Sequence, residues 1–217
     1  MGRKAAVRDA RPMPPPHLTT EEGDQLYTIL APAPDLRDWV IRTFISDDGS
    51  LHNPDHRHLA LADLEFLWAS NAFAKQGRTV VGQAEEVMFR AGGWQKERQE
   101  QQMREWFDRI PKYLITIAAD YSLKCGDVEF CALIEHELYH IAHKTDEFGA
   151  PAFTKEGIPK MGLQGHDVEE FLGVVKRYGV GDPNGALAKL ASLARGAPSV
   201  SRVDVAGACG TCLLRVA

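Results

Sequence analysis

The feature that most constrains the fold is a strand-forming segment followed directly by a helix-forming one. Residues 113–119 are aromatic, β-branched and aliphatic and come after Pro111, which predicts a strand. From Asp127 to about Lys144 the apolar residues recur at helical spacing, and Asp127 is of a type that begins helices. That apolar stripe contains Val128, Cys131, Leu133, Ile134, Leu138, Ile141 and Ala142. The pattern predicts an α+β fold in which a small twisted sheet packs on this helix.

The predicted helix carries the string His136-Glu137-Leu138-Tyr139-His140. Residues four apart lie on one face of a helix, one turn from each other, so the two imidazoles can bind one Zn²⁺ at about 2.0–2.1 Å. Glu137 is rotated away from that face by one residue, so it reaches a water molecule at the metal rather than the metal itself. This is the geometry of peptide-bond hydrolysis by a metal-activated water, with Glu137 as the general base.

On the residues alone, three candidates for the third metal ligand stay open. His166 directly precedes a second predicted helix, and Glu169 or Glu170 lies near the start of that helix. Asp146 continues the histidine spacing along the chain, although the chain turn that this arrangement needs would favour glycine over His143. His166 is preferred because imidazole suits zinc and a preceding glycine lets the backbone approach closely, and Glu169 is the next choice.

Length and charge limit the classes of function. The chain has 217 residues, which suits one domain with appendages, and its net charge of −5 makes nucleic acid an unfavoured partner. No run approaches the roughly 18 apolar residues of a membrane span, so no membrane partner is expected. Four cysteines form no disulfide framework. We therefore expect a cytoplasmic protein, and the oligomeric state is not predicted.

The expected organisation has a central domain with an appendage at each end. Residues 1–20 are basic and proline-rich and are expected to form a flexible, disordered arm. Residues 21–180 are assigned to the metal-binding domain and 181–195 to a C-terminal helix. The tail, 196–217, contains a Cys-x-x-Cys pair, Cys209 and Cys212, expected to be incidental thiols or, alternatively, half of a zinc site.

Smaller elements are expected along the central domain. Helices are predicted over 35–45, 95–109 and 167–178, a turn entering a strand over 77–82, and an irregular hairpin over 152–164. Residues 59–69 suit either a strand or a helix.

Three further groups of polar residues have expected roles. His143 continues the histidine face by one turn and is expected near the metal or on the surface rather than as a ligand. Asp120 and Tyr121 end the predicted strand and can face the site, where a tyrosine can stabilise an oxyanion. A loop cluster is expected to face solvent: His52, His56 and His58.

The string HELYH from His136, followed by GHDVEEFLGVVKRYG over 165–179, resembles the putative phage metallopeptidase family. The segments WASN from Trp68, GRTVVGQA from Gly77 and YLITIAADY extend the resemblance over about residues 50–180. It implies a peptidase of phage or prophage origin with a zincin-like fold. More distantly, the downstream histidine is similar to the third ligand of SprT-type zincins, which again implies His166.

The residues and the resemblance together predict a zinc-dependent peptidase that acts on a peptide or protein substrate. The predicted site comprises His136, His140 and His166 as Zn²⁺ ligands and Glu137 as the catalytic base. The alternative is a catalytically silent phage structural or host-interaction protein in which zinc only ties two helices together. The presence of Glu137 favours the enzyme, because a purely structural site has no use for that carboxylate.

Overall fold

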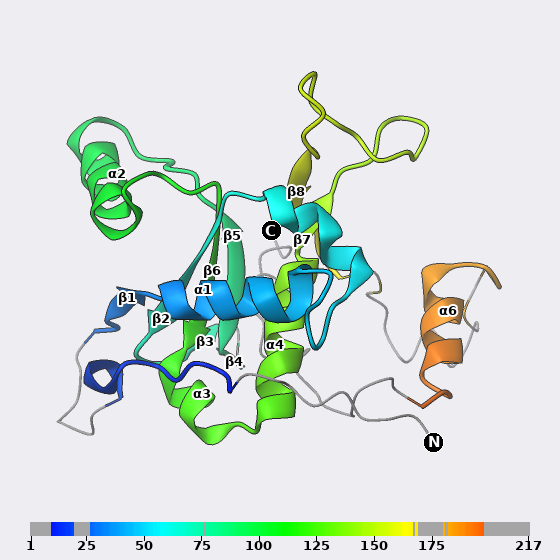
Figure 1. Cartoon of the computed structure of the whole chain (residues 1–217), viewed down its shortest axis with the longest axis horizontal. Coiled ribbons are helices and arrows are strands. Elements are labelled where there is room, and N and C mark those ends of the chain that lie inside the picture. The colour runs from blue at the N-terminus through cyan, green and yellow to red at the C-terminus, as the bar shows by residue number, and fades with distance from the viewer. Residues whose placement is uncertain are drawn as a thin grey trace. The chain divides into compact units, whose positions relative to one another are not determined.

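The computed structural model describes residues 10–19, 27–75, 77–166, 168, 180 and 182–197. The chain divides into two compact units, one of residues 1–164 with 203–217 and the other of residues 165–202. The first unit contains all the described strands and the motif helix, and the second contains the helix α6 (Ala186–Leu193) (Figure 1). The α+β class predicted from the sequence is confirmed.

The main sheet of the first unit has four strands in the order β1-β2-β6-β5. The central strands β2 (Leu64–Ala69) and β6 (Tyr113–Ala118) run parallel, and the outer strands β1 (Leu30–Pro32) and β5 (Gly82–Glu86) are antiparallel to them. Every residue of β2 is buried, so the segment that suited strand or helix is a strand. The strand predicted over 113–119 is present as β6.

Two helices cover one face of this sheet. They are α1 (Pro34–Val40), which continues into a π-helical turn over Ile41–Ile45, and α4 (Asp127–Tyr139), the motif helix (Figure 1). Trp39 of α1 packs on Phe130 of α4 with their ring centroids 5.9 Å apart, and Phe130 also stacks on a tryptophan of β2. This aromatic contact fixes the motif helix against the sheet.

The remaining elements of the first unit lie around this core. Two short hairpins are present, β3 (Phe73–Lys75) with β4 (Arg78–Val80) and β7 (Ile141–His143) with β8 (Met161–Leu163). The helical elements are η1 (Pro16–Leu18), η3 (Pro54–Leu61), α2 (Gly93–Phe107) and α3 (Ala119–Lys124). No helix among the described residues has the length and apolar character needed to cross a membrane.

Residues 10–19 differ from the disordered arm expected there. The Arg11 guanidinium donates to the backbone oxygens of Ser122 and Cys125 at 2.9 and 2.8 Å and forms an ion pair with Asp127 at 2.8 Å. Leu18 is buried in the core. Composition missed this contact because its partners lie more than 100 positions away, and residues 1–9 are outside the described part of the chain.

The motif helix ends earlier than its apolar spacing predicts. It stops at Tyr139, and the chain continues directly as the strand β7 rather than as helix to Lys144. Gln164 occupies the helix end: its backbone N–H donates to the carbonyl of His140 at 2.9 Å and its side-chain amide to that of Tyr139 at 2.9 Å. These bonds satisfy carbonyls that a further helical turn would otherwise use.

Within the range 181–195, predicted as a C-terminal helix, the structure has helix over Ala186–Leu193. The Asp182 carboxylate accepts the backbone N–H of Asn184 and so stabilises a turn before the helix. The predicted helix over 167–178 and the tail with Cys209 and Cys212 lie outside the described residues.

Candidate metal centre

The motif helix presents its histidines because its apolar stripe faces the core. Phe130, Leu133, Ile134 and Leu138 are all buried at helical spacing. At the N-terminus of the helix, Glu129 accepts the backbone N–H of Gly126 at 2.7 Å, which satisfies one donor of the first turn. His136 and His140 lie beside the buried stripe, one half-buried and the other almost fully buried.

The two imidazoles approach each other through one nitrogen each. The Nε2 atoms of His136 and His140 are 3.3 Å apart. Two nitrogens bound to one tetrahedral zinc at about 2.0–2.1 Å lie about 3.3–3.4 Å apart, so this separation matches a shared ion without any movement of the rings.

The other ring nitrogen of His140 is occupied. Its Nδ1 donates to the backbone oxygen of Gln164 at 2.8 Å, so in the neutral imidazole the lone pair is on Nε2. Gln164 therefore does two things at once, since it ends the motif helix and orients the ring of His140. Sequence reasoning missed Gln164 because no local pattern marks a residue that acts 24 positions from its partner.

Glu137 lies on the inner side of the helix and is fully buried, with an exposed fraction of 0%. Its carboxylate adjoins Gly82 at the start of β5: a β-carbon placed on Gly82 would lie 2.8 Å from Oε1 of Glu137 and 2.9 Å from Cδ1 of Leu133. Real β-carbon contacts are not this short, so only glycine leaves room for the carboxylate at this position. Gly82 is a second residue of the site that the sequence did not identify.

His166 follows Gln164 by two residues, in the second unit. Two peptide units span at most about 7 Å between α-carbons, so the chain itself keeps His166 close to the residue that holds His140. Among the described residues, His136, His140 and His166 form the candidate ligand set for a metal ion. Glu169 and Glu170 lie outside the described residues.

The structure gives Asp146 and His143 other partners. The Asp146 carboxylate is exposed and accepts the backbone N–H groups of Phe148 and Ala150, each at 2.9 Å, so it stabilises a turn. His143 is not on the helix, because the helix has ended before it. It lies in β7, where its Nε2 is 2.9 Å from the carbonyl oxygen of Ala152.

The expectation that His52, His56 and His58 face solvent is wrong for the last two. His58 places its Nε2 2.7 Å from the carbonyl oxygen of Ile141, and burial lowers the pKa of its imidazole. His56 is 0% exposed and its ring centroid is 4.5 Å from that of Tyr139. The short helix η3, which contains both residues, thus packs against the motif helix and the strand that follows it.

Asn53, which directly precedes η3, forms hydrogen bonds with two residues on the outer side of the motif helix. Its side-chain amide donates to the carboxylate of Glu135 at 2.6 Å and to the Tyr139 hydroxyl at 2.9 Å. Burial opposes ionisation of Glu135, but the contacts with His56 and Asn53 prevail and hold the pKa of that carboxyl below its ordinary value. Glu135 and Tyr139 each directly precede a histidine of the motif. These hydrogen bonds therefore fix the backbone next to both candidate ligands.

Asp120 and Tyr121 lie in α3 rather than at the end of the strand. The Asp120 carboxylate accepts the backbone N–H of Ala72 at 3.0 Å, and burial raises the pKa of Tyr121 to about 12. These contacts give both residues a structural role in the turn after β6.

Comparison with known proteins gives one match. The family model described as putative phage metallopeptidase matches residues 37–195, a range that includes the motif helix and His166. No curated protein and no solved structure matches the chain.

Proposed function

The chain belongs to the putative phage metallopeptidase family, and from this membership we propose that it is a zinc-dependent peptide-bond hydrolase. The family description supports a metal ion and a protein or peptide substrate. The proposal adds zinc as the metal, His136, His140 and His166 as its ligands, and a zincin-like arrangement of the sheet and the motif helix.

The observation that carries the proposal is the separation of 3.3 Å between the Nε2 atoms of His136 and His140. It equals the spacing of two ligands on a tetrahedral zinc, and the bond from His140 to Gln164 fixes the tautomer that zinc requires. Imidazole ligands suit zinc better than they suit magnesium or calcium, which bind oxygen.

When bound, zinc would lower the pKa of a water molecule and polarise the carbonyl of the scissile bond. In the proposed mechanism Glu137 does the proton transfers. Its carboxylate accepts a proton from the attacking water and returns it to the nitrogen of the leaving amine, while the new C–O bond forms and the C–N bond breaks. Burial between α4 and Gly82 keeps this carboxylate in one position, which favours transfer in a fixed geometry.

The test compares metal content with hydrolysis. Zinc is measured by elemental analysis in the purified chain and in His136→Ala, His140→Ala, His166→Ala and His143→Ala, the last as a control on β7. We expect one zinc per chain, lost in the first three variants and kept in the control. Retention of zinc in His166→Ala would show that the third ligand is a different residue.

Hydrolysis is tested with Glu137→Gln against Glu147→Gln, a control in an exposed turn. On a peptide library, Glu137→Gln should keep zinc and lose about 10²–10⁴-fold in rate, because general-base catalysis contributes that much. Glu147→Gln should match the wild type. A zinc-loaded wild type that cleaves no peptide or protein would instead favour the catalytically silent structural or host-interaction protein.

A further inference from the structure

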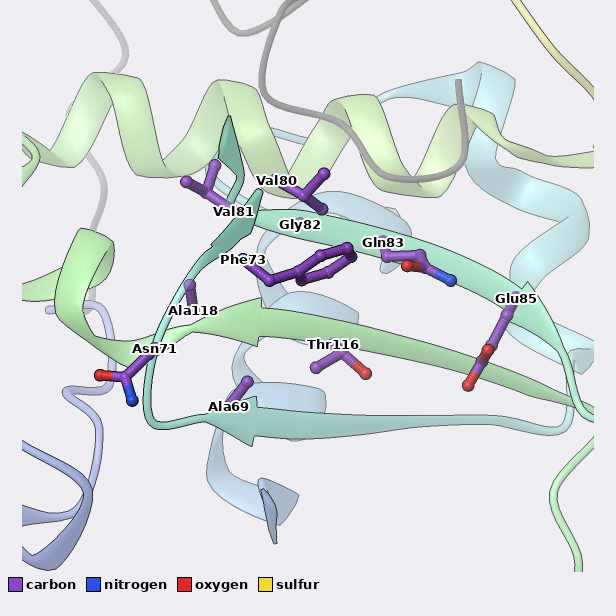
Figure 2. Close-up of a pocket in the computed structure, with 10 residues that line it drawn as sticks. All are labelled: Ala69, Asn71, Phe73, Val80, Val81, Gly82, Gln83, Glu85, Thr116 and Ala118. Carbon is purple, nitrogen blue, oxygen red and sulfur yellow. The ribbon is translucent and has the colours of Figure 1, made fainter. Parts of the chain in front are cut away.

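A pocket opens on one face of the main sheet, beside the strand that adjoins Glu137 (Figure 2). Gln83, Glu85 and Thr116 line it from neighbouring strands; the ring of Phe73 lies toward the Gly82 end of the pocket, and Glu85 lies toward the other end. The cavity volume is about 140 Å³. Pockets that enclose drug-sized ligands have roughly 300–1,000 Å³, so this one suits a single side chain.

Glu85 is the charged residue of the pocket lining. Among the described residues no arginine, lysine or histidine pairs with its carboxylate, and burial raises its pKa above the ordinary value. A partly buried carboxylate normally acquires a cationic partner, because the attraction offsets the loss of hydration.

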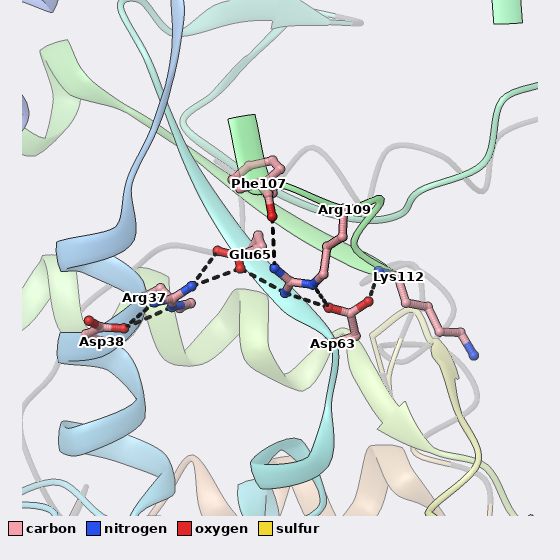
Figure 3. Close-up of polar contacts among 7 residues, drawn as sticks. All are labelled: Arg37, Asp38, Asp63, Glu65, Phe107, Arg109 and Lys112. Atoms are coloured by element: carbon pink, nitrogen blue, oxygen red, sulfur yellow. Dashed lines mark hydrogen bonds and ion pairs between the residues drawn. The ribbon is translucent and has the colours of Figure 1, made fainter. Parts of the chain in front are cut away.

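The same row of the sheet shows how this chain neutralises a carboxylate. Glu65 and Glu85 both align with Leu114, one from each neighbouring strand. Glu65 is 2% exposed and has two guanidinium partners, Arg37 at 2.9 Å and Arg109 at 2.8 Å (Figure 3). Glu85 is thus the carboxylate of this row that has no cationic partner among the described residues.

We propose that this pocket binds the guanidinium group of an arginine side chain of the substrate. A guanidinium can donate two parallel hydrogen bonds to the Glu85 carboxylate. The amide oxygen of Gln83 and the hydroxyl of Thr116 can accept its remaining N–H groups. A lysine ammonium can meet the charge but not the pair of parallel hydrogen bonds.

The pocket adjoins the catalytic carboxylate through Gly82. Gly82 lines the pocket and also lies against Glu137, and the two lie on opposite faces of the outer strand β5: Gln83 and Glu85 point into the pocket, whereas a β-carbon at Gly82 would point to Glu137. Successive side chains of an extended peptide point to opposite sides at about 3.3 Å per residue. A substrate with its scissile bond at Glu137 can therefore place a nearby side chain in the pocket. This inference rests on the proposed function, but its test does not require cleavage.

The direct test measures binding of Nα-acetyl-arginine amide by calorimetry or by NMR titration. The comparison ligand is Nα-acetyl-citrulline amide, which has nearly the same shape and no charge. The wild type should prefer the arginine ligand by about 10–100-fold, the range expected for hydrogen bonds between charged groups. Glu85→Gln should abolish the preference.

The control variant is Glu86→Gln, whose side chain points to the opposite face of the same strand. It should keep the wild-type preference. Equal binding of the arginine and citrulline ligands to the wild type, or an unchanged preference in Glu85→Gln, would overturn the proposal.

A second measurement separates this inference from the proposed function. Peptide pairs that differ only by arginine or citrulline are compared for cleavage by the wild type and by Glu85→Gln. Glu85-dependent binding without any cleavage would support the pocket and refute the peptidase. Zinc-dependent cleavage that shows no preference for arginine at any position, and no effect of Glu85→Gln, would refute the pocket and support the peptidase.

Discussion

The substitution Gly82→Ala tests whether the position of the proposed general base, Glu137, matters, and it does so without replacing Glu137 itself. The added methyl group would lie 2.8 Å from Oε1 of Glu137 and 2.9 Å from Cδ1 of Leu133. Ordinary van der Waals contact begins at 3.4 Å, so the carboxylate must move by about 0.6 Å or β5 must shift away from α4. A misplacement of about 1 Å can reduce a rate 10²-fold.

We therefore expect Gly82→Ala to reduce kcat/KM by about 10–10²-fold while the zinc content stays the same. Overpacking of this kind also costs about 1–3 kcal/mol of unfolding free energy. Rates are measured on the best cleaved peptide, and stability is measured by urea unfolding. Gly92→Ala is the control, because a β-carbon at Gly92 would meet no atom within 4 Å.

The double variant decides whether the effect passes through Glu137. In the Glu137→Gln background, Gly82→Ala should reduce the residual rate only slightly, because the base that it displaces is already absent. Full activity in Gly82→Ala, or an equal loss in both backgrounds, would refute the reasoning.

Three more predictions concern stability. The folded state raises the pKa of Glu85 above the ordinary 4.5, so ionisation of Glu85 destabilises the fold as pH rises through the raised pKa. Glu85→Gln should therefore be more stable than the wild type in urea unfolding at pH 7, and the difference should vanish below about pH 4.5; a constant difference would contradict this cause. Arg11→Ala should lower the unfolding free energy by about 1–3 kcal/mol, because buried carbonyls lose their donor, and an unchanged midpoint would show that the N-terminal contact contributes nothing. Arg37→Ala and Arg109→Ala should each cost little in the same assay, because Glu65 keeps one partner. The double variant should cost more than the sum, up to about 3–5 kcal/mol, and simple additivity would argue against shared neutralisation of Glu65.

Much of the candidate site could be predicted from a short stretch of sequence. The helical spacing that brings His136 and His140 together is a property of five consecutive residues and needs no knowledge of the rest of the chain. The strand at 113–118 was predictable for the same reason, since its side-chain types favour extended backbone wherever they occur. His166 was preferred for its imidazole, for the glycine before it and for the resemblance to SprT-type zincins, and not for its spacing from His140.

Local reasoning failed where a distant contact decided the outcome. Apolar spacing alone continued the motif helix to Lys144, but Gln164 occupies the carbonyls at its end, and the next residues pair with β8 instead. His143 therefore lies on a strand. In the same way, the local sequence predicts that His56 and His58 face solvent. In the structure, the segment that contains them packs on the motif helix and β7.

The sequence by itself determined which residues are candidates for the chemistry: two histidines and a carboxylate on one helix, set by the 3.6-residue turn of the backbone. Tertiary structure alone decided what surrounds them, namely Gly82 beside Glu137, Gln164 on His140 and Glu85 in its pocket. The physical reason is that helix periodicity is fixed by hydrogen bonds within one turn. The position of β5 against α4 is fixed by the packing of the whole core, whose buried residues come from Leu18 to Met161 along the chain.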